Sequence, residues 1–294
     1  MELKINNETL KTVQSSYGDF FSSISGVAVN KIVDDVLSFE KPKEQIALLQ
    51  RFSPEIKGKK LLEVGSGFGN FIVVARKLYA IDAYGIEPSG DGFDDSLILA
   101  KNVLSDNKLS PDIIVDAKGE ALPFVDNLFD ICYSSNVLEH VDDPNKVLSE
   151  MIRVTKPGGI IQVVVPNYGS FFEGHYAVFY LPYQPKWLWK LWIKFVLKRD
   201  LSFVDTLRTN LNYFSIKRMV SHFVKGGNIK ILSWGEDVFK ERMSTANFSD
   251  WAGLGKVKII VRFLQKIKVA SFITNVLLYT KAFTPIILTI RKDK

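Results

Sequence analysis

A glycine-rich turn constrains the fold of this chain more than any other feature of its sequence. The apolar sequence Lys-Leu-Leu-Glu-Val at residues 60–64 predicts a short buried strand, and Gly-Ser-Gly-Phe-Gly follows it directly at residues 65–69. Apolar residues then recur at helical spacing from Phe71. A strand that passes through a glycine turn into a helix brings backbone N–H groups and a helix N-terminus next to a bound ligand. Glycine suits such a turn because a Cβ atom would block the ligand and because some positions require positive φ.

The spacing of the glycines distinguishes between two kinds of cofactor site. A dinucleotide-binding turn follows the pattern G-x-G-x-x-G, whereas this chain has Asn70 where the last glycine would stand. The pattern here is G-x-G-x-G, with the acidic Glu63 two residues before the first glycine. It resembles motif I of the class I S-adenosylmethionine (SAM) methyltransferases and disfavours a nicotinamide-dependent enzyme. The assignment then depends on whether the following elements occur in the expected order.

Beyond the turn, strands and helices are predicted to alternate up to residue 166. A short strand ends at the acidic Glu87, about 20 residues past the turn, where a carboxylate can accept hydrogen bonds from both ribose hydroxyls. Alternation at this spacing indicates an α/β fold with a doubly wound parallel sheet and right-handed crossovers. The other expected elements are a helix at 94–104, strands at 112–115 and 129–134, a helix at 144–154 that Pro-Gly-Gly ends, and a strand at 160–165.

The same region carries a second, longer motif: GEALPF…D…FDICYSSNVLEHV…P…VLSEMIRVTKPGGIIQVVVPN. Together with the glycine turn, this run resembles the small-molecule branch of the class I SAM methyltransferases, which includes ubiquinone-type and glycan-pathway enzymes. The resemblance implies a Rossmann-like seven-stranded sheet and SAM as cofactor, with S-adenosylhomocysteine (SAH) as product. It also implies three segments: a helical cap at 1–57, a SAM-binding core at 58–166, and a substrate-side lid with insertions and closing strands at 167–294.

The resemblance also assigns roles to individual residues. Glu87 would bind the ribose, Pro88 would lie beside the adenine, and Ser135 and Asn136 would line the methionine pocket and the approach to the methyl group. Lys118 stands where many members of the family have an acid, so a backbone contact is expected there. The residues expected to bracket the adenine are Lys118, Gly119 and Glu120. The residues expected to hold the methionine portion are Glu63, Gly65, Ser66, Gly67, Gly69 and Asn70.

The cap, residues 1–57, has apolar residues at spacings of three and four within 30–39 and 42–52, as in amphipathic helices. Two interpretations stay open. The cap is either a helical layer over the edge of the sheet or a flap that closes over the substrate. The aromatic residues of such a flap would be Tyr17, Phe20 and Phe21.

Residues 167–294 are expected to form the substrate side. A glycine and aromatic loop at 167–176 follows the fifth strand, and a Lys- and Trp-rich helix is predicted over 186–199, with lysines at every fourth position. A second basic segment spans 256–268. Such elements are typical of a membrane interface, although a lid helix packed on the domain would have the same composition. Strands at 229–234 and 286–290 are predicted to close the sheet as an antiparallel pair.

Charge and composition narrow the class of partner. The formal net charge of +6 favours an anionic partner, yet no nucleic-acid-binding motif occurs, so a membrane surface is expected rather than nucleic acid. The single cysteine, Cys132, excludes an internal disulfide framework. The first residues do not resemble a signal peptide and no apolar run suffices to span a membrane, so we expect a cytoplasmic protein with peripheral contact through 186–199.

Two of the three histidines are candidates for catalysis. His140 follows the fourth strand, and His175 lies in the loop after the fifth, where either imidazole could act as a general base for a hydroxyl acceptor. A purely structural role stays open for both. No cluster has metal-ligand spacing along the chain, so no metal is expected. The sequence thus predicts a SAM methyltransferase of a small molecule, with a lipid-linked saccharide or envelope glycan as the preferred substrate. A quinone-like lipid and a non-catalytic membrane scaffold are the alternatives.

Overall fold

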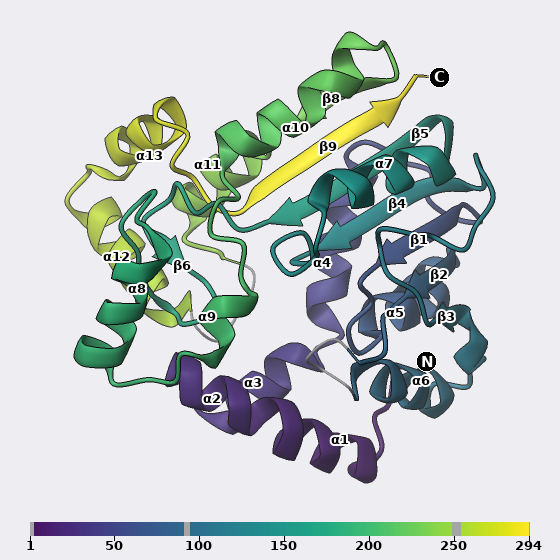
Figure 1. Ribbon diagram of the computed structural model, residues 1–294, viewed down its shortest axis with the longest axis horizontal. Coiled ribbons are helices and arrows are strands. Elements are labelled where there is room, and N and C mark those ends of the chain that lie inside the picture. The colour runs from purple at the N-terminus through teal and green to yellow at the C-terminus, as the bar shows by residue number, and fades with distance from the viewer. Residues whose placement is uncertain (1–2, 91–94, 249–253, 294) are drawn as a thin grey trace.

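The computed structural model describes residues 3–90, 95–248 and 254–293. Its centre is a seven-stranded sheet with the order β3-β2-β1-β4-β5-β9-β8 (Figure 1). The first five strands run parallel, and β9 pairs antiparallel with both β5 and β8. The predicted seven-stranded α/β fold and its closing antiparallel pair are therefore confirmed. The strands are β1 Lys60–Val64, β2 Asp82–Ile86, β3 Ile114–Val115, β4 Phe129–Ser135, β5 Thr155–Val165, β8 Ile229–Ser233 and β9 Ile286–Lys292.

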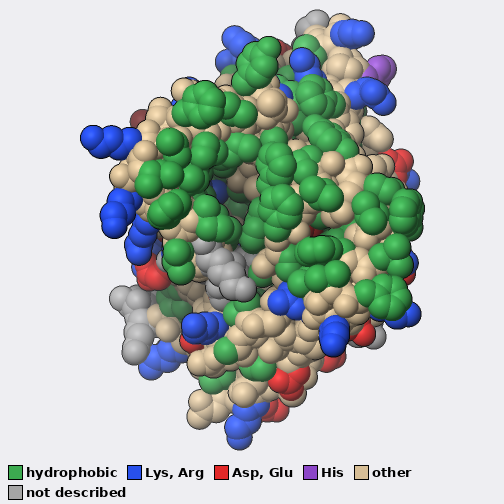
Figure 2. Space-filling model, turned by 90° about the vertical axis from the view of Figure 1, so that its left-hand side faces the viewer, with side chains coloured by type: hydrophobic (Ala, Val, Ile, Leu, Met, Phe, Trp, Pro, Cys, Tyr) green, Lys and Arg blue, Asp and Glu red, His purple; other side chains and the backbone are tan. Residues whose placement is uncertain are grey.

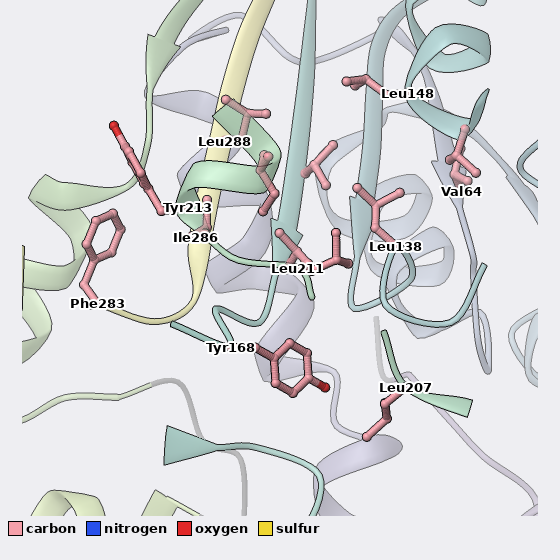
Figure 3. Packing of buried hydrophobic residues seen from close by; sticks show 14 of the residues in the cluster. Val64, Leu138, Leu148, Tyr168, Leu207, Leu211, Tyr213, Phe283, Ile286 and Leu288 are labelled. Carbon is pink, nitrogen blue, oxygen red and sulfur yellow. The ribbon is translucent and has the colours of Figure 1, made fainter. Parts of the chain in front are cut away.

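Helices cover both faces of the sheet because alternate strand residues on each face are apolar. Leu61 of β1 packs with α4, α5 and α6, whereas its neighbour Leu62 belongs to the opposite face with α7 and α10. Figure 3 shows part of that second cluster, including Val64 of β1, Leu138 in the loop after β4 and Leu148 of α7. These helices are α4 Glu40–Gln50, α5 Asn70–Tyr79, α6 Ser96–Asp106, α7 Pro144–Val154 and α10 Tyr213–Lys225.

The remaining elements lie at the carboxyl ends of the parallel strands, at the left and bottom of Figure 1. The N-terminal helices are α1 Asn7–Val13, a π-helical turn Gln14–Gly18, α2 Asp19–Ser25 and α3 Val29–Val36. The substrate side contains a small hairpin, β6 Phe172–Glu173 with β7 Val178–Phe179, and then α8 Lys186–Leu191, a π-helix Trp192–Leu197 and α9 Ser202–Thr206. Helices α11 Glu236–Thr245, α12 Gly255–Lys266 and α13 Ala270–Tyr279 are inserted between β8 and β9.

Three boundaries differ from the sequence prediction. Strand β5 begins at Thr155, because Thr155 pairs with Phe129 and the Pro-Gly-Gly sequence forms an irregularity inside the strand instead of a break before it. Strand β3 is only two residues long, since Pro111–Ile113 forms a 3₁₀ turn. Helix α6 begins at Ser96, and the predicted start at residue 94 lies outside the described residues.

The cap combines the two roles that the sequence left open. Its helix α4 packs on α5 and so covers the sheet. Its aromatic residues instead line the central space, where Phe20 and Phe21 meet Phe203 of α9 with ring centroids 5.9 Å and 5.3 Å apart. The N-terminal segment is therefore both a layer on the sheet and a wall of the space above its carboxyl edge.

Candidate active site

One large cavity, here called the central cavity, occupies the carboxyl edge of the sheet. Its volume is about 2470 Å³, whereas a pocket for one small ligand typically measures about 300–1,000 Å³. The cavity begins where β1 and β4 separate, the point at which the strand order reverses. It extends past the cap to the hairpin and helices of the substrate side. The volume therefore leaves room for a cofactor and a second molecule.

The glycine turn forms one wall of the central cavity. Gly65 has a φ of 77°, and a Cβ atom there would lie 2.3 Å from a methyl carbon of Val137. Gly67 has a φ of 50°, and nothing lies within 4 Å of the place a Cβ would take. Its open face and the N-terminus of α5 behind it are what a bound ligand needs to approach the backbone.

Two carboxylates lie beside the turn, a buried one from Glu63 and a half-buried one from Glu87. Glu87 accepts hydrogen bonds of 2.8 Å from the Gly67 amide and from the Ser96 hydroxyl. Glu63 is 6% exposed, and its Oε2 has no hydrogen-bond partner among the described residues. Burial raises the pKa of both carboxyls, and for Glu63 the charge of Glu87 raises it further. A cationic ligand with ribose hydroxyls would supply the missing partner and the missing charge, so the pair fits SAM.

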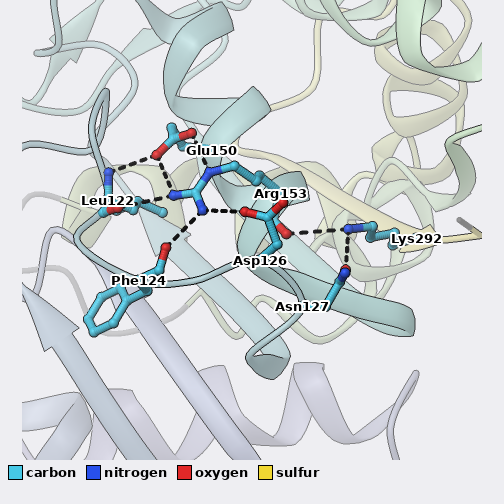
Figure 4. Close-up of polar contacts among 7 residues, drawn as sticks. All are labelled: Leu122, Phe124, Asp126, Asn127, Glu150, Arg153 and Lys292. Carbon is cyan, nitrogen blue, oxygen red and sulfur yellow. Dashed lines mark hydrogen bonds and ion pairs between the residues drawn. The ribbon is translucent and has the colours of Figure 1, made fainter.

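The predicted adenine segment is fixed by a network around Arg153 (Figure 4). Its guanidinium donates to the carbonyls of Leu122 and Phe124 at 3.0 Å and 2.8 Å and contacts the carboxylates of Glu150 and Asp126. These contacts lower the pKa of Glu150, chiefly through its hydrogen bonds with Arg153. The loop after Lys118–Glu120 is thereby tied to α7, which holds the preceding residues at the edge of the cavity.

The side chains of two predicted SAM-binding residues have other partners. Glu120 accepts hydrogen bonds from the amides of Asp142 and Asp143 at 2.9 Å and 3.2 Å, so it braces the loop after β4. Asn70 donates its side-chain amide to the carbonyls of Val36 and Ser38, which joins the cap to α5. Both residues still border the cavity. The sequence could not reveal these partners because they come from other segments.

The other predicted residues border the central cavity, with one exception. Gly69 is the N-cap of α5 and packs toward Ala100 and Ile114, behind the cavity wall. Asn136 has a φ of 56° and turns the chain directly after β4. The predicted residues that line the central cavity are Glu63, Gly65, Ser66, Gly67, Asn70, Glu87, Pro88, Lys118, Gly119, Glu120, Ser135, Asn136, His140 and His175.

The two candidate histidines meet in a group here called the histidine cluster, which consists of Glu139, His140, Glu173 and His175. The two imidazole rings lie 5.4 Å apart between centroids, and both border the cavity. His175 Nδ1 lies 2.7 Å from Glu173 Oε1, and its Nε2 lies 4.0 Å from Glu139 Oε1. Both glutamates are fully buried, at 0% and 1% exposure. Glu139, in the loop after β4, and His175, in the hairpin after β5, thus bring a carboxylate close to an imidazole.

The surroundings of the cluster shift its pKa values in different directions. Desolvation against the cavity wall, and then the charge of His175, lowers the pKa of His140 to about 3, although the residue also has a solvent-exposed side. Desolvation raises the pKa of Glu139 to about 7. Burial by itself would lower the pKa of His175, but the neighbouring Glu173 and Glu139 outweigh it and raise that pKa.

The expectation of no metal relied on spacing along the chain, which does not reveal ligands that the fold brings together. Glu139, His140 and His175 each offer a ligand atom, and these atoms lie within 4.8 Å of one another. Glu139 itself was not among the residues predicted from the sequence. A detectable signal was present, because Glu139 is an acid inside the otherwise apolar run Val-Leu-Glu-His-Val. Arg208 gave no signal, yet its guanidinium holds the carbonyls of Val141 and Asp142 beside the cluster.

Comparisons with known proteins agree with this geometry. Residues 62–163 match the family described as "Methyltransferase domain". An uncharacterized methyltransferase of Mycobacterium tuberculosis is 39% identical over 118 residues, which are 40% of this chain and 43% of the relative. One from Mycobacterium leprae is also 39% identical over 118 residues, 40% of this chain and 41% of the relative. The chain therefore spans under half the length of these curated relatives.

Two solved structures share the fold. A Galdieria sulphuraria protein provisionally named a sarcosine dimethylglycine methyltransferase matches with a TM-score of 0.53 and 14% identity over 98% of this chain and 100% of its own. Haemonchus contortus phosphoethanolamine N-methyltransferase 2 in complex with SAM matches with a TM-score of 0.51 and 18% identity over 86% of this chain and 53% of its own. The fold is thus that of the SAM-dependent methyltransferases, and residues 62–163 are similar in sequence to their methyltransferase domain.

Proposed function

We propose that this protein transfers a methyl group from SAM to a hydroxyl of a lipid-linked saccharide, such as an intermediate of a cell-envelope glycan. The observation that carries the proposal is the continuity of the central cavity. The glycine turn, the histidine cluster and a strongly apolar opening all border the same space. A cofactor, a polar acceptor group and an apolar chain therefore each have a matching part of one cavity.

The cofactor end suits SAM, which supplies an electrophilic methyl group when bound. Glu63 and the half-buried Glu87 place two carboxylates beside the glycine turn, where they would balance a cation and accept from ribose hydroxyls. The main catalytic task of the protein is to hold the acceptor in line with that methyl group. The walls formed by Ser135, Asn136 and the cap would exclude water from this position.

The acceptor end suits a polar group that carries hydroxyls. Arg208, Thr209 and Asn210 line the same cavity, and the backbone amide of Arg208 donates to the carbonyl of Glu139 at 2.8 Å. Several hydrogen-bonding groups around one end of a ligand favour a saccharide over a quinone ring, which offers fewer partners. An imidazole and a buried carboxylate would also assist the loss of the hydroxyl proton during transfer.

The opening of the cavity supports an apolar chain on the substrate. Figure 2 shows hydrophobic side chains gathered around a hollow on this face, with Lys and Arg side chains at its periphery. We call this surface the apolar rim. Trp187 is 64% exposed, Phe195 65% and Phe272 71%. We define the rim by exposed hydrophobic residues of the substrate side, of which Phe171, Phe179, Trp192 and Ile260 also line the central cavity. The others are Leu181, Trp187, Leu191, Phe195, Val196, Ile259, Phe263, Phe272 and Tyr279.

The apolar rim would rest on an anionic membrane surface from which the lipid-linked substrate enters. Trp, Phe and Ile beside lysines are the composition of an interfacial contact. The predicted four-residue lysine stripe is altered, because the helix becomes π-helical at Trp192 and because Lys190 Nζ lies 2.7 Å from Asp205 Oδ2. The other flanking cations include Lys194 and Lys266. No helix in the described part of the chain combines the length and the hydropathy needed to cross a bilayer.

A methyl-transfer assay tests the function. Tritiated SAM would be incubated with the protein and with three acceptors in turn: a polyprenyl-linked saccharide, the same saccharide without lipid, and a quinone precursor. We expect label in the first and far less in the second. Label in the quinone precursor alone would replace the saccharide with the quinone alternative. Binding of SAH without transfer to any acceptor would favour the non-catalytic scaffold.

A flotation assay tests the membrane contact separately. Vesicles containing phosphatidylglycerol should carry the protein upward, whereas neutral phosphatidylcholine vesicles should carry much less. The double variant Trp187→Ser/Phe195→Ser should lose this binding and keep SAH binding. Ile98→Ser, an equally polar change at a residue 59% exposed on α6, is the matched control. Equal flotation of the double variant and the control would contradict the proposed orientation.

A further inference from the structure

We propose that Glu139, His140 and His175 bind one divalent first-row transition-metal ion at the wall of the central cavity. Metal binding itself stands on these residues alone, whereas the use of the ion in catalysis rests on the proposed function. The three ligand atoms lie within 4.8 Å of one another. Two of the residues follow β4 and one lies in the hairpin after β5, so the sheet and the hairpin together position the set.

The first line of evidence is the state of Glu139. Its side chain is 0% exposed, and neither carboxylate oxygen has a hydrogen-bond partner among the described residues. The hydroxyl of the buried Tyr168 likewise has none there. A buried carboxylate without partners is costly, and proteins retain one where it is paired or coordinates a cation. Among the described residues, no lysine or arginine forms an ion pair with Glu139. Its one ionisable partner there is His175, whose Nε2 lies 4.0 Å from Oε1.

The second line of evidence is the orientation of His175. Glu173 Oε1 accepts from Nδ1 at 2.7 Å, which places the proton there and leaves the Nε2 lone pair directed away from Glu173. Glu173 is itself held by the backbone amides of His175 and Tyr176, at 3.1 Å and 2.8 Å. A histidine whose second nitrogen donates to a fixed carboxylate is the usual arrangement of a metal ligand.

The donor set selects the kind of ion. Two imidazoles and one carboxylate suit Zn²⁺, Fe²⁺, Co²⁺ or Mn²⁺, whereas Mg²⁺ and Ca²⁺ prefer oxygen ligands. Three protein ligands also leave at least one coordination position open, as catalytic sites do. Because His140 and His175 both border the cavity, that open position would face the acceptor. Bonds of about 2.0–2.1 Å require ligand atoms roughly 3.3 Å apart, so the side chains must move inward on binding.

The ion would give the cluster a definite chemical role. A hydroxyl of the acceptor that occupies the open position would lose its proton more readily, because a bound cation stabilises the alkoxide. The proton would pass to solvent in the cavity, the alkoxide oxygen would form the new bond to the methyl carbon, and the sulfur would keep the electron pair of the broken bond. Without an ion, His175 would instead have to act directly as the general base.

Metal titration tests the proposal on the untagged, full-length protein after treatment with EDTA and removal of the chelator. We expect calorimetry to show one equivalent of bound Zn²⁺, and we expect Co²⁺ to produce visible absorption bands that Zn²⁺ displaces. Glu139→Gln and His140→Ala should each abolish the one-to-one binding. Glu173→Gln, which removes only the orienting carboxylate, should weaken it by about 10- to 100-fold.

The controls separate this proposal from the proposed function. His222→Ala removes a histidine on α10, outside the cluster, and should leave Zn²⁺ binding unchanged. SAH titration of every variant shows whether the fold and the cofactor site persist, independently of the metal. Zn²⁺ binding with no methyl transfer would support the metal site and contradict only the function. Zn²⁺ binding that is absent, or equal in wild type and His140→Ala, would overturn the metal site.

Discussion

The backbone amide of Gly67 donates a 2.8 Å hydrogen bond to the carboxylate of Glu87, 20 residues further along the chain. This bond joins the glycine turn after β1 to the acid that directly follows β2. It fixes the positions of the two elements on which cofactor binding depends. The relationship also explains why Glu87 tolerates burial, since the Ser96 hydroxyl satisfies its second oxygen at 2.8 Å.

Removal of the Glu87 carboxylate should therefore impair cofactor binding specifically. We expect Glu87→Gln to weaken SAH by about 10- to 100-fold, since a hydrogen bond to a charged group contributes about 1.5–3 kcal/mol. Isothermal titration calorimetry gives the comparison, with the exposed Glu55→Gln as control. Unchanged affinity in a folded Glu87→Gln variant would show that the ribose lies elsewhere.

The same carboxylate should make SAH binding dependent on pH. Burial raises the pKa of Glu87 above its usual 4.5, so the group becomes protonated at a higher pH than an exposed glutamate does. The ionised form is the better acceptor, and affinity should therefore fall as pH is lowered into the range just above 4.5. Glu87→Gln should flatten this part of the profile. An equally steep profile in the variant would assign the dependence to another group.

Substitution of Gly65 should show the geometric requirement of the turn. Gly65→Ala places a Cβ 2.3 Å from Val137 at a φ of 77°. Gly58→Ala is a matched control, because its φ is 73° but nothing lies within 4 Å. Left-handed strain should cost about 1–2 kcal/mol in both, and the clash should add about 1–3 kcal/mol at Gly65 alone. Urea denaturation measures the free energy of unfolding of both variants. Equal losses in the two would mean that the Val137 side chain moves aside at no energetic cost.

The Arg153 network should contribute stability that depends on pH. Arg153→Met leaves the carbonyls of Leu122 and Phe124 without their donor and should cost about 2 kcal/mol at pH 7. Because contact with Arg153 lowers the pKa of Glu150, its contribution is complete above 4.5 and is lost as pH falls below that value. The difference in free energy of unfolding between wild type and Arg153→Met should therefore shrink below pH 4.5.

Denaturation curves at several pH values test this expectation. Lys43→Met removes the exposed pair with Glu40 and should cost at most about 0.5 kcal/mol. A gap between wild type and Arg153→Met that stays constant from pH 7 to pH 3 would argue against the ionic origin of the stabilisation.

The side chain of Asn70 should couple the cap to the core. Asn70→Ala removes the amide that donates to Val36 and Ser38 at 3.1 Å and 3.2 Å. We expect faster proteolysis within residues 3–38, because the link between α3 and α5 is lost, and a smaller loss of SAH affinity. Asn145→Ala, at an exposed position on α7, should leave the rate unchanged. A large loss of SAH affinity without faster proteolysis would instead indicate direct contact with the cofactor.

The sequence by itself determined the cofactor half of the protein. The strand, glycine turn and helix around Gly65, and the acid at Glu87, follow from local rules of backbone geometry and apolar spacing. Short-range patterns of this kind identify a strand, a turn or a helix without information on the segments that pack against it. They also predicted the order of alternating elements and the closing strands near residues 229 and 286, because each strand is an apolar run bounded by breakers.

Only the tertiary structure decided which side chains meet. The approach of Glu139 to His175, the contacts of Asn70 with the cap, and the position of Arg208 join segments whose spacing along the chain carries no signal. Burial depends on the same long-range packing, so the unpartnered state of Glu139 could not be predicted from an apolar run. Polar side chains at the carboxyl edge of a sheet acquire their partners from loops, and loops are positioned by the whole fold.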